Sequence, residues 1–200
     1  MANLLTTLRL LLTVPIVVFM YRTGAAAAWT AFGLFILAML TDVFDGRLAR
    51  RDPGRSPLGN YLDPVADKVL LMSVFICLAG RGIIPVWMVL LLVGREFVVD
   101  GVRSAGAVQG KVVGSNWMGK TKTLVQTFAI SFALLGGALQ AGSTCDASTP
   151  SSIAQSPSSM FFAISWWLTL AVAVAGVIFA LVFVYWNRGI LGLKSNVHGP

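Results

Sequence analysis

Residues 42–67 read DVFDGRLARRDPGRSPLGNYLDPVAD and lie between two long apolar runs of the chain. This stretch holds five of the eight acidic residues in the sequence. Asp42 and Asp45 close the first run at a spacing of i, i+3. Asp63 and Asp67 open the second run at i, i+4. If both runs form helices, each pair lies on one helix face.

Small residues continue both faces. Gly46 and Ala49 follow Asp42 at i+4 and i+7, while Gly59 lies four residues before Asp63 and Ala66 three residues after it, which also share a helix face. A helix face of this kind carries carboxylates next to residues that have little or no side chain. It leaves room for a bulky group to lie against the backbone while the acids reach it. The pattern predicts a ligand site.

The composition is not that of an ordinary soluble domain. Of the 200 residues, 56% are hydrophobic and 12% are charged, which is typical of a polytopic membrane protein. We expect a single domain over residues 1–200. A net charge of +7 also occurs in nucleic-acid-binding proteins, but here most basic residues lie beside apolar runs, where they orient a chain in the bilayer. We therefore expect membrane lipids as partners, and no nucleic acid.

Six apolar segments are long enough to cross a bilayer core, which takes about 20 residues of helix. They lie near Leu4–Tyr21, Ala25–Thr41, Leu62–Ala79, Ile84–Val99, Met118–Gln140 and Met160–Trp186. The second continues as helix towards Arg50, and a tight turn at Gly80-Arg81-Gly82 joins the third to the fourth. The sequence predicts an all-α membrane protein with six transmembrane helices.

Lys and Arg are distributed unevenly over the connections between these segments. With a cytoplasmic N-terminus, only Arg22 and Arg81 of the 15 basic residues lie on the outer side. The polar loop 141–159 has no Lys or Arg, which suits the outer side as well. Because basic residues are enriched on the cytoplasmic side, we expect both termini there, including the short tail 187–200, together with the 42–67 stretch.

Four aspartates at a membrane edge repel one another unless cations compensate their charge. Lys68 and nearby arginines are one source of compensation, in a purely structural network. Oxygen ligands grouped in pairs suit Mg²⁺ or Mn²⁺, and two such ions balance four carboxylates. Metal ions beside arginines indicate phosphoryl transfer, in which an aspartate at the edge of the cluster accepts the proton of an incoming hydroxyl. Four arginines are placed to neutralise a pyrophosphate: Arg47, Arg50, Arg51 and Arg55.

Two other groups of polar residues have more than one interpretation. Asn3, Thr6 and Arg9 form a polar edge on the first segment. This edge reflects either N-capping by Asn3 and snorkelling of Arg9, or contact with a ligand. Asp63 followed by Pro64 matches an N-cap followed by a proline at the first helical position. Capping would account for Asp63 alone and not for Asp67, which lies a turn further along next to an apolar run.

A second concentration of charge follows the fourth segment. Arg95 and Glu96 lie within an apolar run, where ionisable side chains usually face a polar cavity. Arg103 is eight residues beyond Arg95, so the two share a helix face and are predicted to bind an anion. Three lysines of this region are either solvated in a basic inner loop or belong to the same anion site: Lys111, Lys120 and Lys122.

The spaced residues of the opening stretch resemble the signature of the CDP-alcohol phosphotransferase family at every position: Asp42-x2-Asp45-Gly46-x2-Ala49-Arg50-x8-Gly59-x3-Asp63-x3-Asp67. Further stretches resemble bacterial members that make phosphatidylglycerophosphate: Asn3–Arg9, Leu62–Lys68, Arg95–Arg103 and Gly119–Lys122. The resemblance implies a homodimeric enzyme of the bacterial inner membrane with its active site on the cytoplasmic side. It implies transfer of a phosphatidyl group from CDP-diacylglycerol to sn-glycerol 3-phosphate, giving phosphatidylglycerophosphate and CMP.

The resemblance also implies roles for single positions. Asp67 would be both a metal ligand and the general base that activates the acceptor hydroxyl. The other ligands of two Mg²⁺ or Mn²⁺ ions would be Asp42, Asp45 and Asp63. Contacts to the CDP moiety would come from Gly46, Ala49, Arg50 and Ser56, with close approach at Gly59 and further contacts from Asn3 and Thr6. The phosphate of the acceptor would be held by Arg95 and Arg103, with Lys111 and Lys122 beside them.

Other functions also fit the pattern. A sibling enzyme with the same signature would use inositol phosphate, phosphatidylglycerol or serine as its acceptor. A divalent-cation transporter would line a pathway with carboxylates, but this predicts acids near mid-bilayer on several helices. Here four acids lie at one edge beside glycines and arginines, which favours the enzyme. A purely structural scaffold gives no reason to hold so many acids together.

Overall fold

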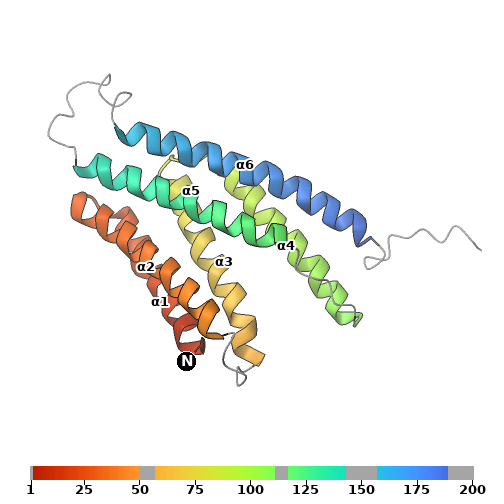
Figure 1. The fold of residues 1–200 in the computed structure, drawn as a ribbon. Helices are drawn as coiled ribbons and strands as arrows, with labels where there is room; N and C mark the ends of the chain where they lie inside the picture. The colour runs from red at the N-terminus through yellow and green to blue at the C-terminus, as the bar shows by residue number, and fades with distance from the viewer. Residues whose placement is uncertain (1, 50–56, 111–116, 143–156, 189–200) are drawn as a thin grey trace, which may run out of the picture.

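The structure is a computed structural model that describes residues 2–49, 57–110, 117–142 and 157–188. Side chains are described for residues 7–41, 65–110, 122–142 and 159–188. The described residues form six helices and no strand, so the all-α prediction is confirmed. The helices, drawn in Figure 1, are α1 (Ala2–Tyr21), α2 (Ala25–Ala49), α3 (Pro57–Gly80), α4 (Val86–Val108), α5 (Trp117–Gly142) and α6 (Pro157–Trp186).

Each predicted segment is a helix, but α4 is longer than predicted. It continues past Val99 to Val108. The helix ends where Gly110 takes a φ of +68°, a conformation that favours glycine, and the Gly110 N–H donates to the Ala107 carbonyl at 3.0 Å. Residues 95–103 therefore lie on one continuous helix.

The third helix, α3, begins at Pro57, before the predicted start at Leu62. The prediction of Asp63 as an N-cap is therefore wrong, because a full turn of helix precedes Asp63 and Pro64. Pro57 takes the first helical position, which suits a proline because an N–H there has no partner within the helix.

The predicted turn between α3 and α4 is confirmed. Gly82 has a φ of +71°, and its N–H donates to the Ala79 carbonyl at 2.9 Å. The N–H of Ile83 donates to the Leu78 carbonyl at 3.0 Å. These bonds satisfy carbonyl groups at the end of α3 that have no partner within the helix. The chain reverses here, and α4 packs back on α3.

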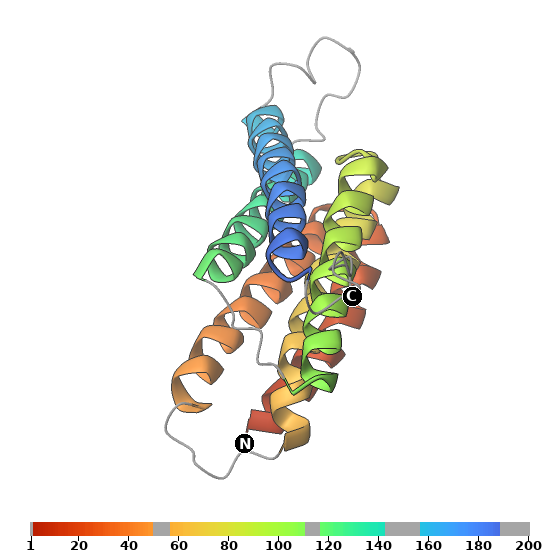
Figure 2. The same ribbon diagram turned by 90° about the vertical axis from the view of Figure 1, so that its right-hand side faces the viewer.

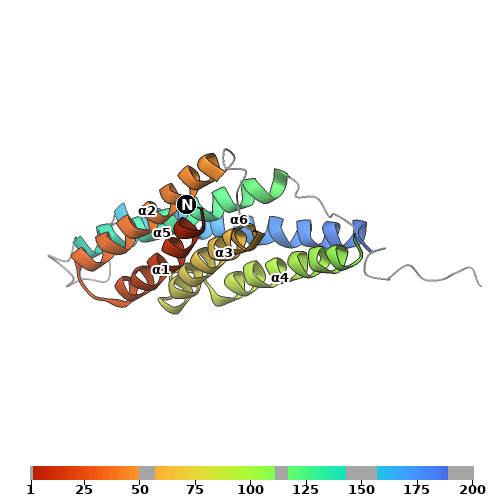
Figure 3. The ribbon, with the colours of Figure 1, turned by 90° about the horizontal axis from the view of Figure 1, so that it is seen from below.

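The first helix, α1, packs against both α2 and α3, and Figure 3 shows it between them. The fifth helix, α5, packs against α2, α3 and α6, while α4 packs against α3 and α6. Apolar side chains fill the centre, and among the fully buried ones are Ile16, Phe35, Leu70, Phe75 and Met88. Figures 1 and 2 show the start of α1, the end of α2 and the start of α3 at the same end of the bundle.

Within the described residues, two helical stretches are long and apolar enough to cross a membrane: Lys122–Gly142 and Ser159–Trp186. Two shorter apolar stretches are Thr7–Tyr21 and Ala25–Thr41. These four stretches correspond to four of the six predicted spans. The other two predicted spans are the helices α3 and α4, which carry charged side chains within their described parts.

Candidate active site

The signature residues lie on two helices. Together, α2 and α3 include every signature position outside the segment 50–56, so the spacings within each half of the signature are helical spacings. Both helices pack against α1 and α5, and their signature-bearing ends lie at the same end of the bundle (Figure 1). The side chains of Asp42, Asp45 and Asp63 lie outside the described residues. Asp67 is therefore the acidic side chain from which the site can be built.

The carboxylate of Asp67 is paired with Arg9 of α1. The Arg9 guanidinium donates through Nη1 to Oδ1 of Asp67, in an ion pair that joins α1 to α3. Arg9 is 1% exposed, whereas the Asp67 side chain keeps 33% of its surface. The snorkelling interpretation of Arg9 is thus wrong. A guanidinium removed from water needs a paired charge, and Asp67 supplies it from the neighbouring helix.

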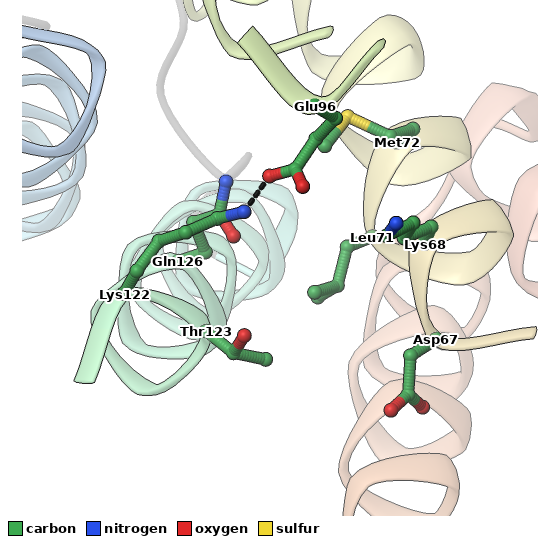
Figure 4. Close-up of a pocket in the computed structure, with 8 residues that line it drawn as sticks. All are labelled: Asp67, Lys68, Leu71, Met72, Glu96, Lys122, Thr123 and Gln126. Atoms are coloured by element: carbon green, nitrogen blue, oxygen red, sulfur yellow. Dashed lines mark ion pairs between the residues drawn. The ribbon is translucent and has the colours of Figure 1, made fainter. Parts of the chain in front are cut away.

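A cavity of about 150 Å³ lies between α3, α4 and α5. Figure 4 shows the residues that line it: Asp67, Lys68, Leu71, Met72, Glu96, Lys122, Thr123 and Gln126. An engineered cavity of similar volume takes one benzene ring. This cavity is therefore large enough for a small polar molecule but not for a diacylglycerol.

Glu96 connects two helices within this cavity. Its Oε1 pairs with the Lys122 ammonium of α5, drawn as a dashed line in Figure 4. The same oxygen lies 3.1 Å from Nη2 of Arg95. The Lys122 side chain is 15% exposed, so solvation in an inner loop is wrong for this lysine. The prediction that Glu96 faces a polar cavity is confirmed.

A further ion pair links α3 to α4. The Lys68 ammonium donates to Oδ2 of Asp100, and both side chains are more than one-third exposed. The sequence suggested that Lys68 compensates the signature aspartates in a structural network. Its described partner is instead Asp100, and Arg9 pairs with Asp67. The negative charge of Asp67 is therefore compensated by Arg9 of α1, a helix that the sequence did not single out for this role.

Arg95 and Arg103 lie outside the lining of the cavity. Arg95 is 7% exposed and packs against Gly176 of α6, where an added Cβ would come within 2.6 Å of its Cδ and 2.9 Å of its Nη1. Nε of Arg103 is buried and has no hydrogen-bond partner among the described residues. The two arginines share α4, as predicted, and Arg95 reaches the cavity wall through its contact with Glu96.

Several predicted contacts lie outside what the structure describes. Arg50, Ser56 and Lys111 fall in segments that are not described at all. Another set has a helical backbone but no described side chain: Asn3, Thr6, Gly46, Ala49, Gly59 and Lys120. The contacts of these positions to a nucleotide or an anion remain predictions.

Two polar residues of the cavity were not predicted from the sequence. Thr123 and Gln126 lie on the α5 wall, next to Lys122 in the helical register. The feature of the sequence that could have pointed to Gln126 was its i, i+4 spacing from Lys122 at the start of an apolar run. A single neutral amide in a hydrophobic segment is too common to point to a site without the fold.

Comparison with known proteins gives the family. A sequence model described as CDP-alcohol phosphatidyltransferase matches residues 1–170. A protein of Bacillus subtilis (strain 168) named CDP-diacylglycerol–glycerol-3-phosphate 3-phosphatidyltransferase is 43% identical over 102 residues, 51% of this chain and 53% of the relative.

Two further relatives match over a longer stretch. A probable phosphatidylglycerophosphate synthase of Mycobacterium tuberculosis (strain H37Rv) is 38% identical over 138 residues, 68% of this chain and 66% of the relative. The protein of Cereibacter sphaeroides with the same name as the Bacillus relative is 37% identical over 142 residues, 69% of this chain and 64% of the relative. The matched stretches thus span between about half and two thirds of the length of these relatives.

Proposed function

Because the chain belongs to the CDP-alcohol phosphatidyltransferase family, we propose that it transfers a phosphatidyl group from CDP-diacylglycerol to sn-glycerol 3-phosphate. The products are phosphatidylglycerophosphate and CMP. The names of the relatives support this acceptor. The observation that carries the proposal is the small cavity with the Asp67 carboxylate on its α3 wall and the Lys122 ammonium on its α5 wall. Such a cavity can hold an alcohol at one side and its phosphate at the other.

Asp67 is the proposed general base. Its carboxylate accepts the proton of the sn-1 hydroxyl of the acceptor as that oxygen attacks the β-phosphorus of CDP-diacylglycerol. A new phosphorus–oxygen bond forms, the bond to the CMP oxygen breaks, and CMP leaves with the bonding electron pair. Arg9 holds the carboxylate in place, because the ion pair ties one Asp67 oxygen to α1. A base held in this way loses less entropy when the acceptor binds.

The family is generally metal-dependent, and the donor set of this chain fits Mg²⁺ or Mn²⁺. Four carboxylates recur at helical spacing on two helices that share the neighbours α1 and α5, and Asp67 faces the cavity. Asp42, Asp45, Asp63 and Asp67 would hold two ions. When bound, such ions neutralise the charge that develops on the diphosphate. Gly46, Ala49 and Gly59 continue the same helix faces and would let the CDP moiety approach the backbone, with Arg50, Ser56, Asn3 and Thr6 as its polar contacts.

The positive side chains around the cavity support a phosphorylated acceptor. Lys68 and Lys122 line the cavity, and Arg95 lies within 3.1 Å of the carboxylate that Lys122 contacts. Arg103 and Lys111 would extend this cationic surface towards the membrane edge. Lys68 and Lys122 each contact one carboxylate of the chain, and a phosphorylated acceptor would add a second anionic partner for them. Serine carries no phosphate and would not supply that partner, which argues against it as the acceptor.

The family is membrane-bound, and we propose that all six helices cross the bilayer with both termini in the cytoplasm. The uneven distribution of basic residues supports this orientation. It puts the cavity at the cytoplasmic edge of the inner membrane, where a lipid donor and a soluble acceptor can meet. We also propose a homodimer, as in the family that the signature resembles.

The test is release of CMP by the purified protein in lipid vesicles that contain CDP-diacylglycerol and Mg²⁺. Four acceptors are compared: sn-glycerol 3-phosphate, inositol phosphate, phosphatidylglycerol and serine. We expect turnover with sn-glycerol 3-phosphate, loss of turnover after chelation, and recovery when Mg²⁺ or Mn²⁺ is restored. Preference for another acceptor would contradict the proposed substrate, and full activity after exhaustive chelation would contradict the metal.

The variant Asp67→Asn tests the proposed base, because it keeps the shape of the side chain but removes the carboxylate. We expect turnover to fall by about 10²–10⁴-fold, the usual contribution of a positioned base, while binding of CDP-diacylglycerol is partly retained. Undiminished turnover in a folded Asp67→Asn protein would remove Asp67 from the role of base.

A further inference from the structure

Gln126 of α5 is a neutral amide buried in the bundle. It is 1% exposed, and its amide nitrogen Nε2 has no hydrogen-bond partner among the described residues. A buried amide that lacks a partner bears the full cost of losing its water, so such groups are rare in folded proteins. An apolar side chain of the same length would fill the same space without the cost of a buried polar group. Since no described residue accepts a hydrogen bond from this amide, it points to a partner that binds in the cavity.

The position of Gln126 suggests what that partner is. It lines the cavity from α5, one helical turn beyond Lys122, while Asp67 lines the same cavity from α3 (Figure 4). In sn-glycerol 3-phosphate the phosphate and the reacting hydroxyl are at opposite ends of a three-carbon chain. With the phosphate beside the Lys122 ammonium and the reacting hydroxyl at Asp67, one polar group is left without a partner. This group is the secondary hydroxyl on the middle carbon.

We infer that the Gln126 amide donates a hydrogen bond to this secondary hydroxyl, and so selects a phosphorylated polyol over a phosphorylated alcohol that lacks it. The inference rests on the proposed function and adds a binding residue to it. A site that offers a buried donor to a substrate hydroxyl rejects an analogue without that hydroxyl, because the donor is then left unsatisfied.

The experiment compares two acceptors, sn-glycerol 3-phosphate and the monophosphate of propane-1,3-diol, which lacks only the secondary hydroxyl. The variant Gln126→Met keeps an unbranched side chain of similar length but removes the donor. For the wild-type protein we expect kcat/KM to be about tenfold higher with sn-glycerol 3-phosphate, the worth of one neutral hydrogen bond. In Gln126→Met this ratio should fall towards one, because kcat/KM decreases for sn-glycerol 3-phosphate and stays nearly the same for the other acceptor.

Two further variants separate binding from packing. Gln126→Leu has an apolar side chain that can neither donate nor accept a hydrogen bond, so it should lose the same discrimination. Ser165→Ala is the matched control, because Ser165 Oγ is equally buried and equally unpartnered among the described residues but lies outside the lining of this cavity. This control should keep the wild-type ratio.

The possible outcomes have separate meanings. An unchanged ratio in Gln126→Met and Gln126→Leu, or a wild-type ratio near one, would overturn the inference while the proposed function stands. Equal losses with both acceptors in the Gln126 variants would mean that Gln126 only packs, which also overturns it. Absence of CMP release by the wild-type protein with every acceptor would instead overturn the proposed function, and the inference with it.

Discussion

Each described carboxylate near the cavity faces a cation from another helix. Asp67 pairs with Arg9, and Glu96 pairs with Lys122. Breaking such a pair by removing one partner is costly when the remaining charge stays buried. These side chains therefore hold their positions before any substrate arrives. At the scale of single residues, the site is preorganised by charge pairs that cross between helices.

Arg9→Met tests the pair on the proposed base. It removes the cation that fixes one oxygen of Asp67, so the carboxylate loses its orientation. We expect CMP release to fall about 10- to 100-fold, as is usual when a hydrogen-bonded neighbour of a metal-ligating group is lost. Arg9→Lys should retain part of the activity. Arg22→Met changes an exposed arginine just beyond the end of the same helix and should behave as wild type; equal effects of both variants would refute a specific role of Arg9.

The pair of Glu96 and Lys122 calls for a double-mutant cycle. Glu96→Gln leaves a buried ammonium without its carboxylate, and Lys122→Met leaves the carboxylate without that ammonium. We expect each single variant to lower the free energy of unfolding, and the double variant to recover about 1–3 kcal/mol relative to their sum. Thermal unfolding in detergent micelles measures the stability, and the KM for sn-glycerol 3-phosphate should rise whenever Lys122 is changed. Strict additivity would show that the two side chains are not coupled.

At the scale of the helices, the sequence predicted the positions of the helices better than the side-chain contacts between them. Apolar runs predicted all six helices because burial and bilayer length both demand such runs. The end of α4 was missed, since apolar content falls at Val99 while the helix continues until Gly110 adopts a positive φ. The spacing of the aspartates survives as helical register on α2 and α3.

The partners of the charged residues could not be predicted from the sequence. Arg9 and Asp67 are 58 residues apart in the chain, and only the packing of α1 on α3 brings them together. Glu96 was recognised as facing a cavity from its apolar surroundings, and Lys122 was a candidate for the same anion site, but nothing in the sequence indicated that the two side chains pair with each other. Gln126 carries no charge, so its importance depends on its burial and on its missing partner. Local periodicity fixes helix faces, whereas helix packing decides which faces meet.

Gly176→Ala tests how α6 positions Arg95. An added Cβ would lie 2.6 Å from Cδ of Arg95, so either this side chain or the α4–α6 contact must shift. We expect the KM for sn-glycerol 3-phosphate to rise several-fold, with a smaller change in kcat. Gly33→Ala is the control, because a Cβ there meets no atom of the described structure within 4 Å and alanine favours a helix. A wild-type KM in Gly176→Ala would show that the exact position of Arg95 does not matter.

At the scale of the whole molecule, the signature positions gather at one end of the bundle. The start of α1, the end of α2 and the start of α3 lie together at one end (Figure 1), and this end carries the signature. Two of the helices also contain stretches that are apolar and long enough to cross a membrane. Under the proposed function and orientation, a lipid donor would enter from the bilayer while a soluble acceptor would enter from the water at the end that carries the signature. This division of access needs a fixed orientation in the membrane.

The two cysteines allow that orientation to be tested without adding a tag. Cys145 belongs to the loop 141–159, which we expect outside the inner membrane, and Cys77 is buried within α3. A membrane-impermeant maleimide should therefore label the protein in intact spheroplasts, unchanged by Cys77→Ser and abolished by Cys145→Ser. A cysteine placed in the tail by Ser195→Cys, in a chain without Cys145, should be labelled only after lysis because the tail is expected in the cytoplasm. The reverse labelling pattern would put the signature aspartates on the outer face of the membrane. Phosphorylated acceptors and CDP-diacylglycerol are not available there, so this result would contradict the proposed function.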